Sequence, residues 1–486
     1  MIVEILGAKM LSPFLGLSHF VWTAQIAVTL VSLACGYYVG GRLADRSQNP
    51  GMLYGVILAA AAYLVLTVLI CESVAYWCLD FKLATGSLLA STFLFFVPLA
   101  LLAMTGPFLI RVMTASVAGV GGTAGRLTAI GTLGSFVGTI CIGYFMLPLL
   151  PNSVSMYLTA ALLVLVSAGY FVFFHRRARA PLVVAAGLTI VIALLASRSP
   201  IHQHTGYVEL FRGNSNFGDL VVLEQRDGKA RIYANDNLFQ NAYDPVRKQS
   251  AALFTYMLAG LARAYTTNIS DVLCIGMGVG IVPMEFAKEG ARVDVVEINP
   301  GVLPVAVKYF DLEPEHLNIS FDDGRHFLNE CRKQYDVIAL DAFLGDSSPS
   351  HLMTREAFAA MRRVLRPGGT LVINAFCHLD DDRDFFAASL RRTLESVFPG
   401  VQMHSDDNQN YFVATDRSSP VFVRAPELDR VHPMLRSRAR AVFARVLATP
   451  PDHGLVLTDD YNPAEFYDAK NRELTRRSQV GRMRQM

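Results

Sequence analysis

The sequence has 486 residues, of which 52% are hydrophobic and only 17% are charged, so it has room for about two or three domains. Its formal net charge of +2 is too small to indicate a nucleic acid as the partner. The seven cysteines include no CxxC pair and no cysteine–histidine cluster, so we predict neither a metal site nor a disulfide framework.

Apolar residues are concentrated in residues 1–200, which we expect to form a transmembrane helical domain. Six runs there are near the length of about 20 residues at which a helix crosses a bilayer. The small residues Gly131, Gly134, Ser135 and Gly138 lie in the fourth run and predict close packing against another helix. The predicted spans are about 17–41, 51–71, 83–110, 126–148, 152–174 and 180–197, and the last is the shortest.

Charged residues return, at a density typical of soluble domains, in the rest of the chain. Residues 201–265 are expected to form a small β region followed by a connecting helix at 247–265. Two apolar runs, 220–224 and 230–234, surround an Asp-Gly turn and predict a β-hairpin.

Residues 266–486 alternate between apolar strands and helices. Repeated βαβ units predict a doubly wound parallel sheet, that is, a Rossmann-like fold. Ligands of such sheets lie at the carboxyl ends of the strands. The strands are expected at 271–276, 292–297, 318–321, 335–341 and 369–375, with helices beginning near 281, 301, 325 and 354.

A glycine loop follows the first of these strands. Gly276, Gly278 and Gly280 allow the backbone to turn tightly and to approach a ligand closely. Glu297 ends the second strand, where a carboxylate can accept hydrogen bonds from both hydroxyls of a ribose. Loop and acid together predict a nucleoside-binding site. The alternative is a tight packing turn beside a surface glutamate.

Two more acids follow later strands. Asp323 comes after the third strand, where it is well placed for the amino group of an adenine. Asp341 closes the fourth strand and faces the reacting centre, where a carboxylate can attract an amine and accept its proton. Either aspartate could instead cap the helix that follows it.

With these residues in place, the soluble half resembles the spermidine synthase family of aminopropyltransferases. The whole chain is similar to bacterial proteins that fuse such a domain to a multi-helix membrane region. The phrases that carry the resemblance are the Gly-Gly-Arg-Leu-Ala-Asp run at 40–45, the glycine loop, Asp-Ala-Phe at 341–343, and the motifs at 351–356 and 457–463.

The resemblance implies transfer of an aminopropyl group from decarboxylated S-adenosylmethionine to a polyamine or another small amine, without a metal. It implies that Glu297 binds the ribose, Asp323 the adenine, and that Gln240 lines the donor pocket. Asp341 would accept the proton of the attacking amine. Soluble members of the family are often dimers, so a homodimer is possible.

Three positions depart from the family pattern, and each normally anchors a cationic amine. Val279 replaces an aspartate of the glycine loop, residues 254–255 replace a Tyr–His pair, and Leu344 replaces a second aspartate. Losing an ion pair in a desolvated site costs several kcal/mol unless another group replaces it. The candidate replacements in the substrate site are Asp346, Tyr256, Asp459 and Asp460, and the last two could equally form a loop ion pair or a cap.

Three functions remain open from the sequence. The first is a membrane-tethered aminopropyltransferase. The second is an S-adenosylmethionine-dependent methyltransferase on the same fold, because the loop aspartate that favours an aminopropyl ammonium is missing. The third is a transporter or sensor that binds a nucleoside or a polyamine without chemistry. The presence of Glu297, Asp323 and Asp341 together argues against the third, since a regulator needs no acid at a reacting centre.

The resemblance places the chain in a bacterial inner membrane, as a multi-pass protein. Arg42 and Arg46 follow the first span, Arg111 and Arg126 flank the third loop, and a basic run lies at 175–179. By the positive-inside rule these loops are cytoplasmic. Six spans would then place the soluble domain outside, whereas S-adenosyl compounds are made in the cytoplasm. A sixth segment that does not cross removes the conflict, and we expect the soluble domain in the cytoplasm.

Overall fold

The structure is a computed structural model. It describes residues 1–16, 18–114, 116–174, 187, 206–343, 348–380, 383–406, 409–447 and 453–485. The chain divides near residue 204 into two compact units, and each is described by itself. The first unit is helical and the second is an α/β domain with an additional β-sheet.

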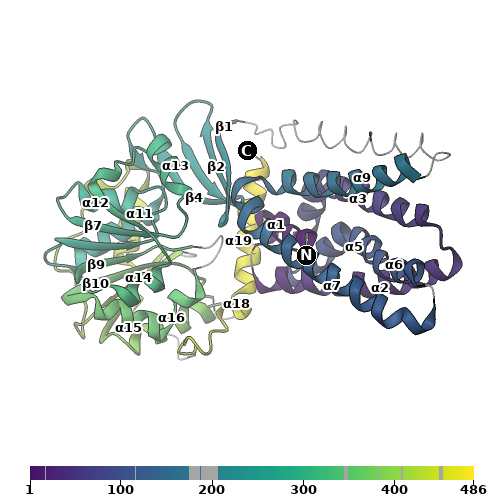
Figure 1. Ribbon diagram of the computed structural model, residues 1–486. Coiled ribbons are helices and arrows are strands. Elements are labelled where there is room, and N and C mark those ends of the chain that lie inside the picture. The colour runs from purple at the N-terminus through teal and green to yellow at the C-terminus, as the bar shows by residue number, and fades with distance from the viewer. Residues whose placement is uncertain are drawn as a thin grey trace. The chain divides into compact units, whose positions relative to one another are not determined.

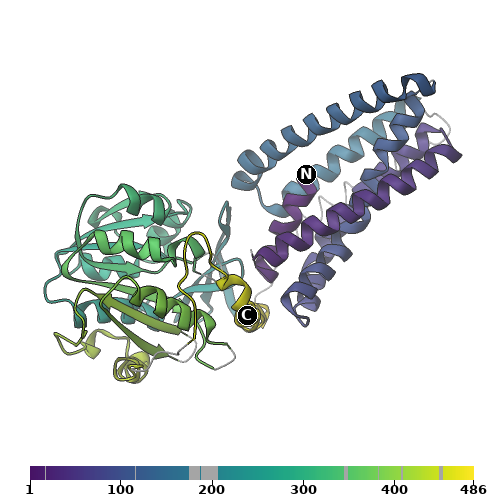
Figure 2. The ribbon, with the colours of Figure 1, turned by 90° about the horizontal axis from the view of Figure 1, so that it is seen from below.

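The first unit contains five helical stretches that are long and apolar enough to cross a membrane, judged by length and composition. They agree with the first five predicted spans, and the segment predicted at 180–197 lies outside the described residues except for residue 187. The stretches are His19–Arg46, Pro50–Cys78, Leu83–Met113, Val120–Leu149 and Asn152–Phe174. Figure 2 shows these long helices, coloured purple to blue, extending side by side.

The individual helices of this unit include two π-helical turns. Each π-helical turn, Thr92–Phe96 and Cys141–Met146, is followed closely by a proline, a residue that cannot donate to the helical ladder. The helices are α1 (Ile2–Leu15), α2 (His19–Arg46), α3 (Pro50–Cys78), α4 (Leu83–Ser91), α5 (Val97–Ala103), α6 (Thr105–Met113), α7 (Val120–Ile140), α8 (Leu147–Leu149) and α9 (Asn152–Phe174).

Close helix packing occurs on α2, whereas among the glycines of α7 only Gly138 has a close neighbour, since a Cβ there would lie 3.2 Å from the side chain of Ile2. A Cβ atom on Gly36 would lie 2.3 Å from the carbonyl oxygen of Ala100, so α2 and α5 approach each other at backbone distance. The packing predicted at Gly131 and Gly134 is wrong for the described residues, since no atom lies within 4 Å of a Cβ built there.

The second unit begins with a five-stranded sheet in the order β1-β2-β3-β4-β5. The predicted hairpin is confirmed, because β2 and β3 pair in antiparallel fashion. The helix predicted at 247–265 begins only at Leu253, because residues Gln249–Ser250 instead pair with β4. The strands are β1 (Tyr207–Ser215), β2 (Gly218–Gln225), β3 (Arg231–Asn235), β4 (Leu238–Asp244) and β5 (Gln249–Ser250), and the helix is α11 (Leu253–Tyr265).

The main sheet has seven strands in the order β11-β12-β10-β9-β6-β7-β8. Strands β8, β7, β6, β9 and β10 are parallel, which confirms the predicted Rossmann-like core, and β12 and β11 add an antiparallel edge. The strands are β6 (Asp271–Ile275), β7 (Arg292–Glu297), β8 (Leu317–Phe321), β9 (Tyr335–Leu340), β10 (Leu365–Phe376), β11 (Gly400–Asp406) and β12 (Gln409–Thr415).

Helices cover both faces of this sheet (Figure 1). A separate apolar core fills each side. Helices α11, α12 (Ile281–Ala287), α13 (Val302–Tyr309) and α17 (Arg436–Ala444) pack on one face. Helices α14 (Gly324–Glu330), α15 (Arg355–Arg363) and α16 (Phe385–Glu395) pack on the other. The chain ends with α18 (Ala464–Tyr467) and α19 (Ala469–Gln485).

The order of the strands reverses at β6. The chain passes from β6 outward to β7 and β8, then returns to place β9 on the opposite side of β6. The carboxyl ends of β6 and β9 therefore form the switch point at which doubly wound sheets bind their ligands.

Candidate active site

The glycine loop turns directly against the end of β9. Gly276 and Gly280 have φ values of +91° and +84°, which residues other than glycine rarely adopt. A Cβ atom on Gly276 would lie only 2.3 Å from the carbonyl oxygen of Asp341. The amide of Asp341 in turn donates to the carbonyl of Ile275 over 2.9 Å. The sequence needs glycine here because two backbones meet.

Glu297 joins the glycine loop to the end of β7. Its side chain is buried, and its two oxygens accept hydrogen bonds from the amides of Met277, at 2.9 Å, and Asn299, at 2.8 Å. Burial raises the pKa of the Glu297 carboxyl, and the two amides oppose that rise. Each oxygen of a carboxylate has a second lone pair, so both can still accept a hydroxyl of a ligand.

Asp341 is held by an amide chain from β10 and β12. The Nδ2 atom of Asn374 donates to Oδ1 of Asp341 over 2.8 Å, and Nε2 of Gln409 donates to Oδ1 of Asn374 over 3.1 Å. Burial raises the pKa of Asp341 to about 6, with the charge of Glu297 adding to the rise and Asn374 opposing it. A partly buried carboxyl with this pKa can lose and regain a proton near neutral pH.

Asp323 caps a helix and also meets a histidine. Its Oδ1 accepts from the amides of Arg325, at 2.8 Å, and His326, at 3.2 Å, which is the capping role left open by the sequence. Its Oδ2 lies 2.9 Å from Nε2 of His351. Burial would raise the pKa of Asp323, but the His326 amide and the His351 side chain outweigh it, so the pKa is lowered. The adenine contact stays a prediction.

Strand β4 carries Gln240, which is predicted to line the donor pocket. The next residue of this strand, Asn241, lies against the glycine loop. The Nδ2 atom of Asn241 lies 2.9 Å from where a Cβ of Gly278 would be. The Oδ1 atom of Asn241 is buried and has no hydrogen-bond partner among the described residues. A hydrogen-bond donor of a bound ligand would satisfy that oxygen, so this end of the glycine loop fits a polar ligand.

The predicted amine-binding residues do not converge on Asp341 through any hydrogen bond among the described residues. The hydroxyl of Tyr256 is buried and donates to the carbonyl of Ser250 over 2.8 Å. Asp459 forms the loop ion pair that was one of its two predicted roles, with Arg325 at 2.8 Å. Asp460 is exposed, and Asp346 lies outside the described residues.

At two of the positions that depart from the family pattern, the side chain is buried in the domain. The side chain of Val279 is 1% exposed and belongs to the core beneath α11 and α12. Thr255 is also buried, and its hydroxyl donates to the carbonyl of Ala252 over 2.9 Å. Neither side chain is available to hold an ammonium group. Leu344 lies outside the described residues.

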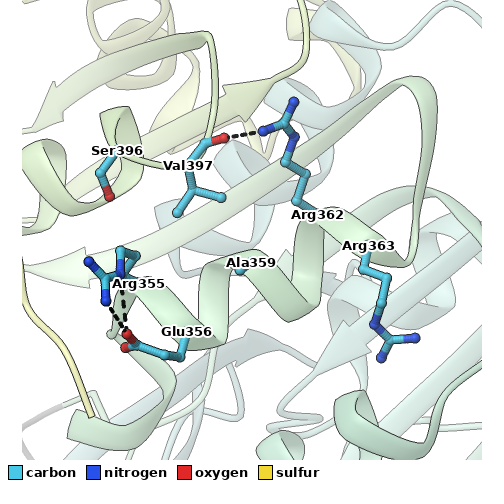
Figure 3. Close-up of a pocket in the computed structure, with 7 residues that line it drawn as sticks. All are labelled: Arg355, Glu356, Ala359, Arg362, Arg363, Ser396 and Val397. Atoms are coloured by element: carbon cyan, nitrogen blue, oxygen red, sulfur yellow. Dashed lines mark hydrogen bonds and ion pairs between the residues drawn. The ribbon is translucent and has the colours of Figure 1, made fainter. Parts of the chain in front are cut away.

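A separate pocket of about 720 Å³ lies on the outer side of α15 (Figure 3). Its arginines are engaged locally, with Arg355 paired to Glu356 at 2.8 Å and Arg362 donating to the Val397 carbonyl. Because none of its lining residues belongs to the glycine loop or to the acids described above, we place the candidate active site at the strand ends. The pocket is lined by Arg355, Glu356, Ala359, Arg362, Arg363, Ser396 and Val397.

Comparison with known proteins shows which family this part of the chain resembles. The model of the spermine/spermidine synthase domain matches residues 252–405. A polyamine aminopropyltransferase of Vibrio vulnificus is 33% identical over 173 residues, which are 33% of this chain and 57% of that protein. An N-terminal histidine N-methyltransferase of Emericella nidulans is 28% identical over 254 residues, which are 46% of this chain and 44% of that protein. The chain thus spans about half the length of these curated relatives.

Among solved structures, the spermidine synthase of Thermotoga maritima aligns with a TM-score of 0.38 and 19% identity, over 47% of this chain and 77% of that one. The matched residues 252–405 contain the glycine loop, Glu297, Asp323 and Asp341. The part of the chain that holds the candidate active site is therefore similar to the spermine/spermidine synthase domain.

Proposed function

We propose that this chain is a membrane-anchored transferase that moves an aminopropyl group from decarboxylated S-adenosylmethionine to an amine. The observation that carries the proposal is Asp341, a partly buried carboxyl at the switch point with a pKa near 6, oriented by Asn374 and adjoining Gly276. The relatives named polyamine aminopropyltransferases support the same reaction class.

In this proposal the adenosine end of the donor lies along the glycine loop. Glu297 accepts hydrogen bonds from the ribose, Asp323 accepts from the adenine amino group, and Gln240 lines the pocket beside Asn241. The nitrogen of the acceptor attacks the propyl carbon that is bonded to the sulfonium, and the carbon–sulfur bond breaks. Its electron pair goes to sulfur, which leaves as neutral methylthioadenosine, and Asp341 accepts the proton released by the nitrogen.

The apolar first unit supports the anchoring. Five helices of sufficient length and apolarity support a multi-pass membrane protein, and we place it in the bacterial inner membrane. We place the α/β domain in the cytoplasm, where the donor is made. The proposed division is a membrane domain at 1–200, a β region with α11 at 201–265, and the Rossmann-like domain at 266–486.

Methyl transfer from S-adenosylmethionine is the second candidate. Val279 is favourable to it, because the buried valine offers no charge to an aminopropyl ammonium. Relatives named as methyltransferases, one from Emericella nidulans and one from Drosophila melanogaster, also favour it.

One incubation separates the candidates. Purified full-length protein is given each donor with a panel of amines, and the products are identified by mass spectrometry. Release of methylthioadenosine supports aminopropyl transfer, whereas release of S-adenosylhomocysteine supports methyl transfer. Neither product, together with polyamine uptake into proteoliposomes, would support a transporter or sensor.

Asp341→Asn should lower the turnover by about 100-fold or more, because the proton acceptor is lost. The matched control is Asp227→Asn, which makes the same change in the exposed turn between β2 and β3 and should leave the turnover unchanged. An Asp341→Asn protein with full activity would overturn the role of this carboxyl.

A further inference from the structure

Two aromatic rings lie just beyond the Asp341–Asn374 pair. Phe343 follows Asp341 by two residues, and Phe376 follows Asn374 by two residues. The ring centroids of Phe343 and Phe376 are 5.0 Å apart with an interplanar angle of 57°. Both residues are partly exposed, unlike the fully buried rings of the core.

The pairing of β9 with β10 places these rings on the side of the sheet that carries Asp341. The two strands are parallel, with Leu340 beside Ile373, so the next residues along are Asp341 and Asn374, which are hydrogen-bonded. Side chains alternate between the two faces of a strand, so Phe376 stands on the same face as Asn374. The contact between the rings brings Phe343 to that face as well.

Along this face of the sheet, three kinds of side chain therefore follow one another. Ala339 and Val372 belong to the buried core, Asp341 and Asn374 form the polar pair, and the phenylalanine rings follow at the strand ends. In the proposed reaction, an acceptor whose nitrogen is beside Asp341 would have the substituent of that nitrogen next to the rings.

We infer that the acceptor is a primary amine with an apolar or aromatic substituent, rather than a diamine or polyamine. This inference rests on the proposed aminopropyl transfer and names its substrate class. A diamine would bring a second ammonium against the two rings. Rings attract a cation, but this attraction replaces only part of the hydration that the ammonium loses. An apolar substituent instead gains from leaving water at this position.

The covalent step is unchanged by the substituent. The lone pair of the amine forms the new carbon–nitrogen bond, the carbon–sulfur bond breaks toward sulfur, and Asp341 accepts the proton. The products are methylthioadenosine and the N-aminopropyl derivative of the amine.

The test measures methylthioadenosine release by the full-length protein with decarboxylated S-adenosylmethionine. The acceptors are 2-phenylethylamine and hexylamine in one arm, and putrescine and spermidine in the other. We expect kcat/KM to be at least about tenfold higher in the first arm. Equal or better use of putrescine would overturn the inference and leave the aminopropyl transfer intact. No methylthioadenosine with any amine would instead overturn the proposed function.

Variants at Phe376 test the cause of the preference. Phe376→Glu supplies a carboxylate for a second ammonium and should shift the ratio of kcat/KM toward putrescine by about tenfold or more. Phe376→Leu stays apolar and should keep the preference for hexylamine. The control is Val307→Glu, which adds the same charge on the exposed side of α13 and should leave the ratio unchanged.

Methylthioadenosine binding, measured by calorimetry, reports whether each variant is folded at the donor site. A Phe376→Glu protein that still binds methylthioadenosine but keeps the ratio of the parent would contradict a role of the rings in selecting the acceptor. If Phe376→Glu does not fold, Phe376→Gln provides the same comparison with a polar group, and an unchanged ratio there has the same meaning.

Discussion

Asp341 is a carboxyl whose ionisation is costly in the folded chain. Burial raises its pKa to about 6 from an ordinary value of 3.8. Between these two values the folded protein keeps a proton that the unfolded chain has released. The stability therefore falls as the pH rises through this window, and it stays lower above the folded pKa.

Asp341→Asn removes this cost, so the variant should gain stability relative to the parent at pH 8 but not at pH 3.5. We expect a gain of about 1 to 3 kcal/mol, measured by thermal unfolding of the α/β domain in the full-length protein. Asp227→Asn is the control, because backbone contact with Lys229 lowers the pKa of Asp227 and no gain is expected. Equal differences between variant and parent at the two pH values would contradict the burial of charge at Asp341.

The same pKa predicts the pH dependence of the reaction. Asp341 accepts a proton only when it is ionised, so turnover should fall as the pH drops through about 6. The measurement is a profile of kcat/KM against pH between about 5 and 8 with a single amine. A rate that is flat across this interval would exclude Asp341 as the proton acceptor.

At the scale of single residues, the sequence predicted the acids that lie at the ends of strands. It did not predict the amide residues that hold Asp341 through hydrogen bonds. Glu297 ends β7 and Asp341 follows β9; the structure places Asp341 at the switch point and Glu297 beside it, on the amide of Met277. Asn374 and Gln409 were not predicted, because their contacts join strands about 30 residues apart and the pattern of a single strand contains no such information. The one signal for Asn374 was a polar residue in an apolar strand.

Among the elements, the glycine loop depends on a single close approach of two backbones. Gly276→Ala would place a Cβ 2.3 Å from the carbonyl oxygen of Asp341 and would add the strain of a positive φ. We expect a loss of more than about 3 kcal/mol of stability, together with loss of methylthioadenosine binding.

Gly290 provides the matched control for this loop. Its φ is +86°, but a Cβ there has no atom within 4 Å, so Gly290→Ala should cost only the backbone strain of about 1 to 2 kcal/mol. Thermal unfolding and ligand binding of both variants give the comparison. Similar losses in the two variants would show that strain alone, and not contact with the end of β9, makes glycine necessary at Gly276.

The strands and helices were predicted well where the pattern of apolar residues is strong. Four of the five parallel strands appear within a residue of their expected positions, because a buried parallel strand is a continuous apolar run. The fifth, β10, begins at Leu365, four residues before its expected start. The two-residue strand Gln249–Ser250 was missed, and the start of α11 with it, since a pair of polar residues shows no periodicity. The antiparallel strands β11 and β12 were also not predicted.

In the whole molecule, if the apolar stretches cross a membrane as proposed, the number of crossings decides on which side the α/β domain lies. Asp45 and Arg111 form an ion pair, with Oδ1 and Nε 3.5 Å apart, at the ends of α2 and α6. The loops that follow the first and third apolar stretches are therefore at the same end of the helical unit. This agrees with the sequence, in which both loops carry arginine and are expected to be cytoplasmic by the positive-inside rule.

From these loops the topology can be followed to the end of α9. If the loop after α2 is cytoplasmic, the third stretch ends in the cytoplasm and the fifth, Asn152–Phe174, ends there too. The basic run 175–179 then has the charge that the rule requires. We predict that alkaline phosphatase fused at the C-terminus is inactive and that a green fluorescent protein fused there is fluorescent. The control is a phosphatase fused after Asp80, between α3 and α4, which should be active. An active phosphatase at the C-terminus would place the α/β domain outside, away from its donor, and would mean that 180–197 crosses as a sixth span.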